Sequence, residues 1–177
     1  RRRIRIRRTS NRVNKELDLN FYIMNSHHTV AIGTWEGDKQ QSIEYNSSIA
    51  VGIDCPRAKL RVSILLDTIQ EYQVRYIFSD EEISEAVNEA GLIIGARGIA
   101  YEGVLQRKPV IVVGEYGFGG LVTPDTLHEQ YNNYFRGKIN GIKAEYFSLE
   151  RLEEEIRRGF ALTFQELQMM SNQTIRF

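Results

Sequence analysis

Short apolar runs alternate with amphipathic stretches along most of this chain. Residues 58–72 repeat apolar side chains at the spacing of one helix face, whereas residues 92–94 and 110–113 are continuous apolar runs with the length of buried strands. Strands are predicted at residues 21–24, 30–34, 49–53, 74–78, 92–94, 110–113 and 144–147. Helices are predicted at residues 58–72, 80–90, 99–107, 124–135, 149–159 and 162–170. This alternation predicts an α/β fold, a Rossmann-like and mostly parallel sheet with helices on both faces.

Local signals support several of these boundaries. Ser79 followed by Glu82 is a capping-box pattern at the start of the helix predicted at residues 80–90. Thr123 and Pro124 are typical of a helix start, and Ser148 is a suitable cap for the helix that begins at residue 149. These signals place the helices between the strands in the order that a parallel sheet needs.

The junction after residues 92–94 carries the most chemical information. Gly95-Ala96-Arg97-Gly98 follows the strand, and a helix begins at about Ile99. Such a junction aims free backbone N–H groups and a positive helix end at the carboxyl edge of a parallel sheet. Glu102, one turn into the helix, is within reach of sugar hydroxyls. The arrangement suits a phosphorylated, sugar-bearing ligand.

The same stretch resembles the donor-binding, carboxyl-terminal half of glycosyltransferases of the GT-B fold. In that family a strand reading adlvIg is followed by a Gly/Arg turn and a helix with the signature E-a-l-a-x-G-K-P-V-I-V. Here AGLIIG precedes the turn and EGVLQRKPVIV follows it. GGLVTP and NYFRGK look like the G-W-V-T-P-E and N-F-S-G-R segments of a bacterial subgroup. The resemblance covers roughly residues 74–158.

The resemblance implies one half of a GT-B architecture, which transfers a sugar from a nucleotide-diphosphate sugar to an acceptor. In it the 95–99 junction binds the diphosphate, Glu102 binds the ribose, and the glycine-rich segment 114–120 forms the floor or lid of the sugar pocket. The donor-binding residues so implied are Gly95, Arg97, Gly98, Ile99, Glu102, Gly117, Gly119 and Gly120. No cofactor and no metal are expected, because the helix end and the guanidinium of Arg97 can take a metal's role.

Each of these residues also has a plainer interpretation. Glu102 suits a glutamate that stabilises its own helix dipole, and segment 95–98 suits an ordinary strand-to-helix turn. Segment 114–120 suits a flexible surface loop whose Tyr116 and Phe118 pack back on the sheet.

Four further side chains are possible catalytic groups. His27 and His28 are adjacent on a predicted strand, so they cannot easily serve one site. His128 lies on a predicted helix and is expected to be solvated. Asp54, at a strand end, is a better carboxylate candidate, although the Cys-Pro pair beside it reads equally well as a helix-entry turn.

The chain departs from the family pattern in three ways. Many retaining members carry a second glutamate eight positions before the helix glutamate, where this chain has Ile94. Lys39 is only a loose match to the basic pair that binds the donor phosphates. Residues 1–73 are too few for an amino-terminal acceptor domain, so a separate acceptor domain or partner subunit is expected. Whether the chain is an enzyme stays open: the alternatives are a non-catalytic nucleotide- or sugar-binding regulatory module and a structural interaction domain without a ligand.

Composition limits the class and location of the protein but identifies no further site residues. The 177 residues, 42% hydrophobic and 26% charged, suit a soluble globular protein. No apolar run is long enough to cross a bilayer and no secretory signal is visible, so a cytoplasmic location is expected. Cys55 is the only cysteine, which excludes a disulfide or a cysteine-built zinc site within the chain. Residues 1–28 are expected to form a basic arm and linker, and residues 29–177 a Rossmann-like nucleotide-sugar-binding domain.

Six arginines crowd the first eight residues, and without them the chain has six more acidic than basic residues. The run from Arg1 to Arg8 suits an arm for anionic lipid headgroups or nucleic acid. It also suits an edge strand with solvated arginines or an arbitrary cut site, and we favour these. The acidic remainder disfavours a nucleic-acid partner, while peripheral contact with an anionic membrane stays open. The start at Arg1 rather than Met fits a fragment or processed product.

Overall fold

The computed structural model describes residues 27–36, 39–139 and 141–176, with side chains placed from Ser47 onward. The chain divides into two compact units. One holds a β-hairpin and Glu71–Gln73, and the other comprises Ser48–Gln70 and Val74–Phe177. The larger unit therefore begins at Ser48, and the domain boundary expected after residue 28 stays a prediction.

The first unit is described through its hairpin alone. Strand β1 (His27–Glu36) pairs antiparallel with β2 (Lys39–Asn46), and the register shifts between Ile32 and Glu36. The strand predicted at residues 30–34 lies inside β1, while β2 was not predicted because its sequence is largely polar. The strand predicted at residues 21–24 and the arm from Arg1 to Arg8 lie outside the described residues.

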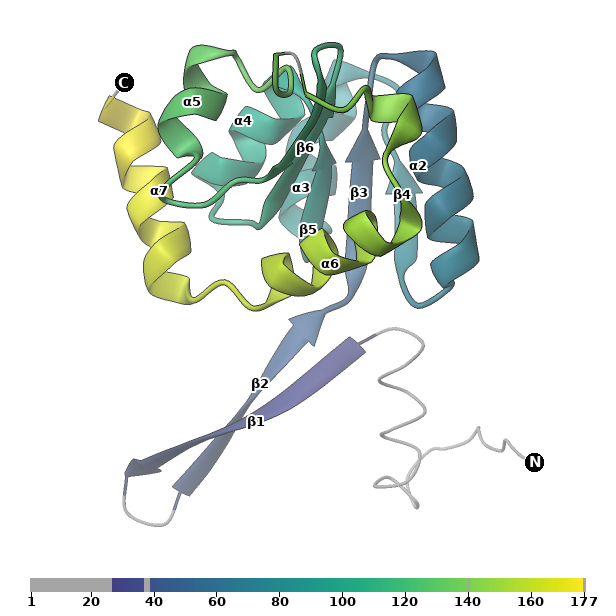
Figure 1. Cartoon of the computed structure of the whole chain (residues 1–177). Coiled ribbons are helices and arrows are strands. Elements are labelled where there is room, and N and C mark those ends of the chain that lie inside the picture. The colour runs from purple at the N-terminus through teal and green to yellow at the C-terminus, as the bar shows by residue number, and fades with distance from the viewer. Residues whose placement is uncertain (1–26, 37–38, 140, 177) are drawn as a thin grey trace, which may run out of the picture. The chain divides into compact units, whose positions relative to one another are not determined.

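The second unit is built on a five-stranded sheet in the order β4-β3-β5-β6-β7 (Figure 1). Its strands are β3 (Ser48–Gly52), β4 (Gln73–Tyr76), β5 (Leu92–Gly95), β6 (Val110–Gly114) and β7 (Gly117–Leu121). β3 pairs in parallel with β5, and β5 pairs in parallel with β6. β7 runs antiparallel to β6 at the edge. The sheet is therefore mostly parallel and Rossmann-like, as the sequence predicts.

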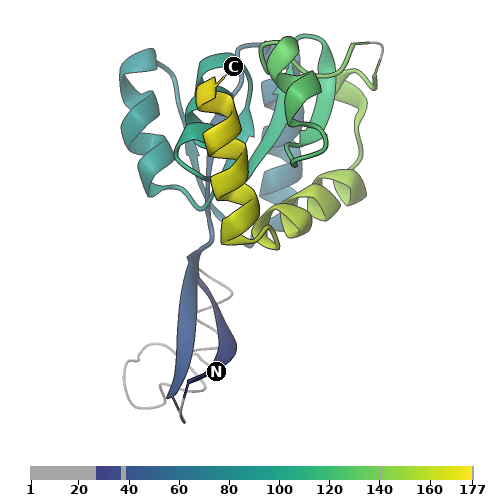
Figure 2. The ribbon, with the colours of Figure 1, turned by 90° about the vertical axis from the view of Figure 1, so that its left-hand side faces the viewer.

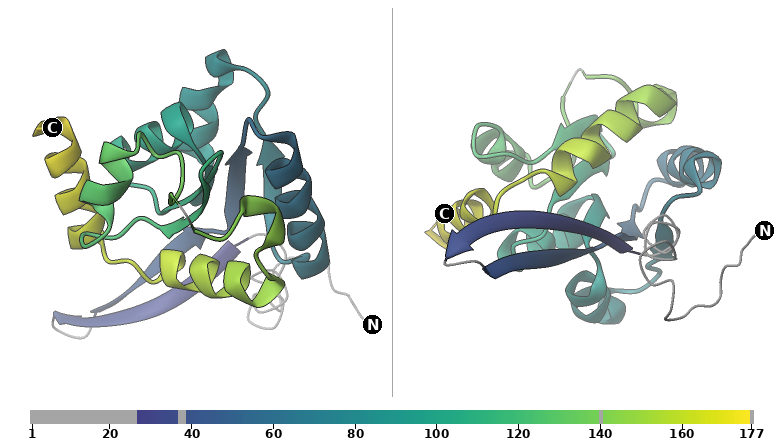
Figure 3. Two further views of the ribbon diagram at one scale, coloured as in Figure 1. Left: turned by 45° about the horizontal axis from the view of Figure 1, so that its top comes forward. Right: turned by 90° about the horizontal axis from the view of Figure 1, so that it is seen from below.

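Helices cover both faces of this sheet (Figures 2 and 3). They are α2 (Pro56–Ile69), α3 (Ile83–Glu89), α4 (Arg97–Leu105), α5 (Leu127–Asn132), α6 (Leu149–Phe160) and α7 (Phe164–Arg176). Gly103 of α4 packs against Ile93, whereas Gly159 of α6 packs against the adjacent residue Leu92. Because neighbouring side chains on a strand point to opposite faces, α4 and α6 lie on opposite sides of the sheet. α2 contacts α6, while α3 and α7 contact α4.

Burial explains why these strands are continuous apolar runs. Every residue of β5 and β6 is buried, as expected for parallel strands covered on both faces. On the α4 side one apolar cluster joins the sheet to α3, α4, α5 and α7. Across the part of the chain with described structure, no helix is long and apolar enough to cross a membrane.

Strand order is where the sequence-based topology was wrong. The strand–helix–strand alternation predicts that the consecutive strands at residues 74–78, 92–94 and 110–113 are parallel neighbours in one sheet. The parallel pairing of β5 with β6 is confirmed, but β3 lies between β4 and β5. Periodicity identifies buried strands without saying which of them pair, because pairing is a contact between residues far apart in the chain.

Several local expectations were also corrected. Residues 144–147 form no strand but a turn of 3-10 helix, η2 (Ala144–Tyr146). The helix predicted to begin at residue 124 begins at Leu127, after a turn in which Thr123 and Thr126 bond to each other. Ser148 does cap α6, accepting the N–H of Arg151. Before α3 the chain forms a short 3-10 helix, η1 (Asp80–Glu82).

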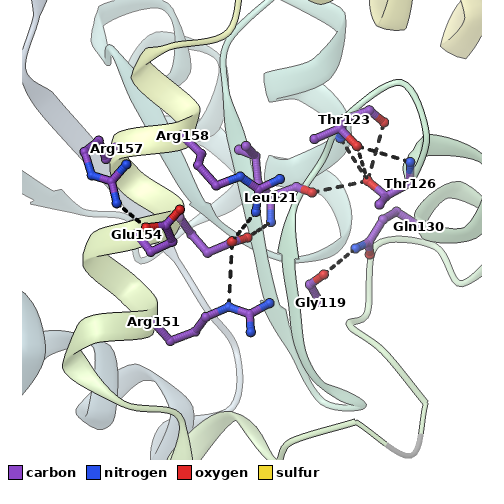
Figure 4. Close-up of polar contacts among 10 residues, drawn as sticks. Gly119, Leu121, Thr123, Thr126, Gln130, Arg151, Glu154, Arg157 and Arg158 are labelled. Atoms are coloured by element: carbon purple, nitrogen blue, oxygen red, sulfur yellow. Dashed lines mark hydrogen bonds and ion pairs between the residues drawn. The ribbon is translucent and has the colours of Figure 1, made fainter.

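A buried carboxylate fastens α6 to the edge strand β7. Glu155 is only 2% exposed and accepts the backbone N–H of Leu121 at 2.5 Å. Its other oxygen lies 2.6 Å from Nη1 of Arg158 and 3.7 Å from Nε of Arg151. Figure 4 labels the three partners of Glu155, which are Leu121, Arg151 and Arg158. The carboxylate therefore satisfies a backbone donor of β7 while two half-exposed arginines balance its charge.

Removal of the Glu155 carboxylate should destabilise the fold. Glu155→Ala leaves the N–H of Leu121 without an acceptor, so the free energy of unfolding should fall by about 2–4 kcal/mol. Glu154→Ala, at the exposed neighbouring pair with Arg157, should cost under about 0.5 kcal/mol. Denaturant titrations of both variants test this, and equal losses would contradict the structural role of Glu155.

Candidate functional site

A pocket opens at the carboxyl edge of the sheet. It has a volume of about 350 Å³ and lies where β3, β4 and β5 end. Its lining comes from the segment after each strand: Gly52, Ile53, Asp54, Ile77, Phe78, Ser79, Asp80, Ile83, Ala96, Arg97, Gly98 and Ile99. Three connections that are distant in sequence therefore meet at one site.

The topology accounts for this opening. The chain leaves β3 into α2 on one face of the sheet and leaves β5 into α4 on the other. Between two adjacent parallel strands whose connections diverge in this way, a crevice opens beyond the strand ends. β3 and β5 are such a pair, and both contribute to the pocket lining.

Glycines at the strand ends let α4 approach closely. A Cβ on Gly95 would lie 2.5 Å from the carbonyl oxygen of Gly52, and one on Gly52 would lie 2.8 Å from Cδ1 of Ile99. Neither position can hold a side chain without displacing backbone or Ile99. Gly98 differs, because a Cβ there would meet only Cδ1 of Ile83 at 4.0 Å. Packing within the protein therefore does not explain why residue 98 is glycine, whereas close approach of a ligand would.

The N-terminus of α4 opens onto the pocket. Ala96 occupies the N-cap position and has no side-chain oxygen to accept a backbone N–H. The N–H of Arg97 is used by the carbonyl of Phe135 at 3.0 Å. The next two backbone donors belong to Gly98 and Ile99, which line the pocket. They lie at the positive end of the helix, where an anion is favoured.

A network of charges continues from Arg97 along the sheet edge. Nη2 of Arg97 lies 2.6 Å from Oε1 of Glu115, and its Nε lies 3.9 Å from Oδ2 of Asp54. Oε2 of Glu115 in turn lies 3.2 Å from Nε of Arg136. Arg136 also donates to the Tyr116 hydroxyl at 3.0 Å, and that hydrogen bond, with the nearby Glu115 carboxylate, raises the pKa of Arg136. Arg136 is therefore cationic at neutral pH.

Unusual backbone conformations concentrate at this edge. Arg97 has a φ of 56°, and the consecutive residues Tyr134 and Phe135 have φ values of 55° and 53°. Left-handed conformations are costly for non-glycine residues and persist where the surroundings enforce them, often at functional sites. Here the strained segment supplies the carbonyl of Phe135 to Arg97 and the carbonyl of Arg136 to the N–H of Tyr116.

The structure brings together part of the residue set that the sequence favoured. Gly95 lies at the end of β5, and Arg97, Gly98 and Ile99 line the pocket beside it. Glu102 is not in the pocket lining; its carboxylate accepts a hydrogen bond from Gln106 on the same helix at 2.8 Å.

The segment expected to be a glycine-rich loop is a hairpin instead. Only Glu115 and Tyr116 form its turn, and Gly117, Gly119 and Gly120 belong to β7, outside the pocket lining. Packing explains these glycines: a Cβ at Gly119 would meet the Gln130 amide, and one at Gly120 would lie 2.9 Å from Oε2 of Glu155. Gly117 has a φ of 117° and lies against the carbonyl of Ile142. A glycine count does not separate ligand contact from close packing.

Other residues at this edge are ones that the sequence pattern does not identify as site residues, apart from Asp54. Phe78 and Asp80 line the pocket because β4 ends just before them. Phe78 is 77% exposed, with Nζ of Lys59 4.1 Å from its ring centroid. Asp54, already a candidate at a strand end, also lines the pocket. Arg136 follows no strand, so only its contact with Glu115 reveals its place at the site.

The histidine candidates belong to other elements of the chain. His27 and His28 are consecutive residues of β1, in the other unit, and their side chains are not described. Lys39 begins β2 in that unit, and its side chain likewise lies outside the described part. His128 is on the exposed side of α5, as predicted.

No family model, no curated protein and no solved structure matches this chain. Within residues 27–36, 39–139 and 141–176, no three His, Cys, Asp or Glu side chains form a group that could hold a metal ion. The site is therefore interpreted from its own geometry.

Two glycine substitutions should separate packing from ligand access. Gly98→Ala should leave the free energy of unfolding unchanged or raise it by up to about 1 kcal/mol, since alanine suits a helix better than glycine. Gly95→Ala should lower it by about 1–3 kcal/mol, because its Cβ overlaps the carbonyl of Gly52. Thermal and denaturant unfolding measure both values, and a clear loss in Gly98→Ala would show that packing requires that glycine.

Proposed function

We propose that the α/β unit binds a nucleoside diphosphate at the carboxyl edge of its sheet, as the donor domain of a glycosyltransferase that uses a nucleotide-diphosphate sugar. The observation that carries the proposal is Gly98. It stands at the open N-terminus of α4, beside Arg97, and no packing contact requires its lack of a side chain. A ligand that approaches the backbone closely supplies the missing reason.

Phosphate is the chemistry that this end of the pocket favours. Backbone N–H groups at a helix N-terminus and a guanidinium together form the usual protein partners of a phosphate group. Arg97 provides the guanidinium, and Gly98 and Ile99 provide the N–H groups. The cavity of about 350 Å³ lies within the range of small-molecule sites, roughly 300–1,000 Å³.

Other residues of the pocket lining suit a nucleoside. The side chain of Asp54 is 85% exposed and lines the pocket, so its carboxylate can accept hydrogen bonds from two adjacent ribose hydroxyls. The exposed ring of Phe78 offers a flat surface on which a base can stack. In this arrangement Asp54 takes the ribose role that the resemblance gives to Glu102, which lies off the pocket.

The transferase part of the proposal rests on the sequence pattern from AGLIIG to NYFRGK. Transfer requires an acceptor hydroxyl held within reaction distance of the donor's anomeric carbon. We propose that a separate acceptor domain or partner subunit supplies that side of the cleft. The role of the α/β unit is to hold the donor and to stabilise the departing diphosphate through the end of α4 and Arg97.

Binding measurements with and without the ribose test the site. UDP or GDP should bind, and Asp54→Asn should weaken that binding by about 1–2 kcal/mol, the scale of a lost charge-assisted hydrogen bond at an exposed site. The same substitution should not weaken the binding of inorganic diphosphate, which has no ribose and which is repelled by the Asp54 carboxylate 3.9 Å from Arg97. Glu102→Gln is the matched control and should cost under about 0.5 kcal/mol for either ligand. A loss in Glu102→Gln alone would assign the ribose to Glu102.

Gly98→Ala and Gly98→Val provide an independent test. Larger side chains fill the space that the phosphate needs, so affinity for both UDP and inorganic diphosphate should fall stepwise, by about tenfold or more for valine. Titration calorimetry measures each constant. Unchanged affinity in the valine variant would place the phosphate elsewhere and remove the central support for the proposal.

Turnover distinguishes a transferase domain from a nucleotide sensor. The chain alone should bind donor but release little nucleoside diphosphate from a nucleotide-diphosphate sugar, with or without acceptor. Addition of a cognate acceptor domain or subunit should restore release that depends on Arg97. Tight donor binding that stays without turnover in every such combination would favour the non-catalytic regulatory module.

A further inference from the structure

We infer that Arg97 and Arg136 form a second anion subsite, for the second phosphate of a diphosphate, and that the Glu115 carboxylate occupies this subsite until the ligand displaces it. The inference rests on the proposed function, because it takes the first phosphate to lie at the end of α4. It adds Arg136 and a gating carboxylate, Glu115; neither residue is in the pocket lining or among the donor-binding residues that the sequence resemblance implies.

The bridging geometry of Glu115 is the main observation. One of its oxygens lies 2.6 Å from Nη2 of Arg97, and the other lies 3.2 Å from Nε of Arg136. A single carboxylate thus spans two guanidinium groups. A phosphate has more oxygens and more charge, and it pairs with guanidinium groups by the same charge-assisted hydrogen bonds. The space between the two arginines therefore has the chemistry of a phosphate site and is filled by an internal anion.

Arg136 is held in place by contacts other than Glu115. It donates to the hydroxyl of Tyr116 at 3.0 Å, and its guanidinium lies 5.7 Å and 5.8 Å from the ring centroids of Tyr116 and Tyr134. Its Nε is buried without an aligned hydrogen-bond acceptor, although Oε2 of Glu115 is close. Arg136 therefore keeps its position when Glu115 leaves, and it has a donor that a better-placed anion can use.

The backbone fixes the two arginines relative to each other. The carbonyl of Phe135 accepts the N–H of Arg97, and the carbonyl of Arg136 accepts the N–H of Tyr116. Both carbonyls belong to a segment that contains residues with left-handed backbone conformations. Such conformations are unfavourable by themselves and persist because the surrounding structure holds them. A site for two phosphates needs this preorganisation, since flexible arginines would lose conformational entropy on binding.

Glu115 is free to move in a way that the arginines are not. It lies in the two-residue turn between β6 and β7, so its side chain can rotate away while both strands keep their pairing. Its side chain is 39% exposed, against 47% for Arg97 and 35% for Arg136. Ion pairs this exposed contribute little stability, so exchange of the carboxylate for a ligand anion costs little.

Charge balance explains the selectivity that follows. The cluster holds two guanidinium groups, Arg97 and Arg136, against two carboxylates, Asp54 and Glu115. While Glu115 is in place, the cluster has no net charge with which to attract an anion. A ligand with one phosphate is held at the end of α4 without displacing Glu115. A diphosphate engages both arginines, which offsets the loss of the internal carboxylate, so the subsite selects for two linked phosphates.

Titration of the full chain with inorganic diphosphate and with inorganic phosphate tests the inference. Glu115→Gln removes the internal competitor with little change of shape, so diphosphate should bind about 3- to 10-fold more tightly while phosphate changes less than about twofold. Arg136→Gln should weaken diphosphate binding by about tenfold and leave phosphate nearly unchanged, whereas Arg136→Lys should retain part of the diphosphate affinity. Thermal unfolding checks that each variant is folded.

Two exposed pairs serve as controls. Glu154→Gln and Arg75→Gln break comparable carboxylate–arginine pairs away from the pocket and should leave both affinities unchanged. Weaker diphosphate binding in Glu115→Gln would make Glu115 a residue that positions the arginines, and would overturn its gating role. Equal losses of phosphate and diphosphate in Arg136→Gln would overturn the second subsite.

The outcomes also distinguish a failure of the second subsite from a failure of the proposed function. If diphosphate binds and Gly98→Val abolishes that binding, but the variants at residues 115 and 136 behave as wild type, the nucleotide site stands and the second subsite falls. If neither the wild-type chain nor Glu115→Gln binds diphosphate or UDP, the proposed function falls as well.

Discussion

The contact between the carboxyl ends of β3 and β5 is the constraint on which the α/β unit and its pocket depend. Gly52 and Gly95 are register partners in the parallel pair, and a Cβ on either would overlap backbone or Ile99. Because no side chain intervenes, α4 begins directly at the sheet edge and places Ile99 against both glycines. The end of α4 consequently faces the crevice where the connections from the two strands diverge.

The antiparallel hairpin β6–β7 places its two-residue turn at this edge of the sheet. Its short turn brings Glu115 beside Arg97, and the strained segment around Phe135 ties the same turn to the end of α4 through backbone hydrogen bonds. Backbone hydrogen bonds therefore fix the positions of Arg97 and Arg136 at this edge. A side chain there can be replaced without breaking those bonds. Such a framework is what a preorganised anion site requires.

Two arginine–carboxylate clusters in this unit differ in burial and consequently in role. Glu155 is buried and serves a backbone donor of β7, so its loss leaves an unsatisfied group in the interior. Glu115 is exposed and serves only two arginines, so its pairs can be exchanged at little cost to the fold. The same residue types thus fasten a helix in one place and leave a charge available in the other, and the surrounding dielectric makes the difference.

The sequence by itself determined the α/β class, the neighbouring parallel strands β5 and β6, and the junction that presents Arg97, Gly98 and Ile99 together. These features depend on periodicity and on residues adjacent in the chain, which local physical chemistry controls. Only the tertiary structure decided that β3 lies between β4 and β5, that the glycines of β7 serve packing, that Glu102 lies off the pocket, and that Arg136 joins Glu115. The side on which Glu102 lies depends on how α4 packs on the sheet, and the other three are contacts between segments far apart in the chain. Such contacts are selected by burial and charge in the assembled fold, and the local pattern of residues does not contain them.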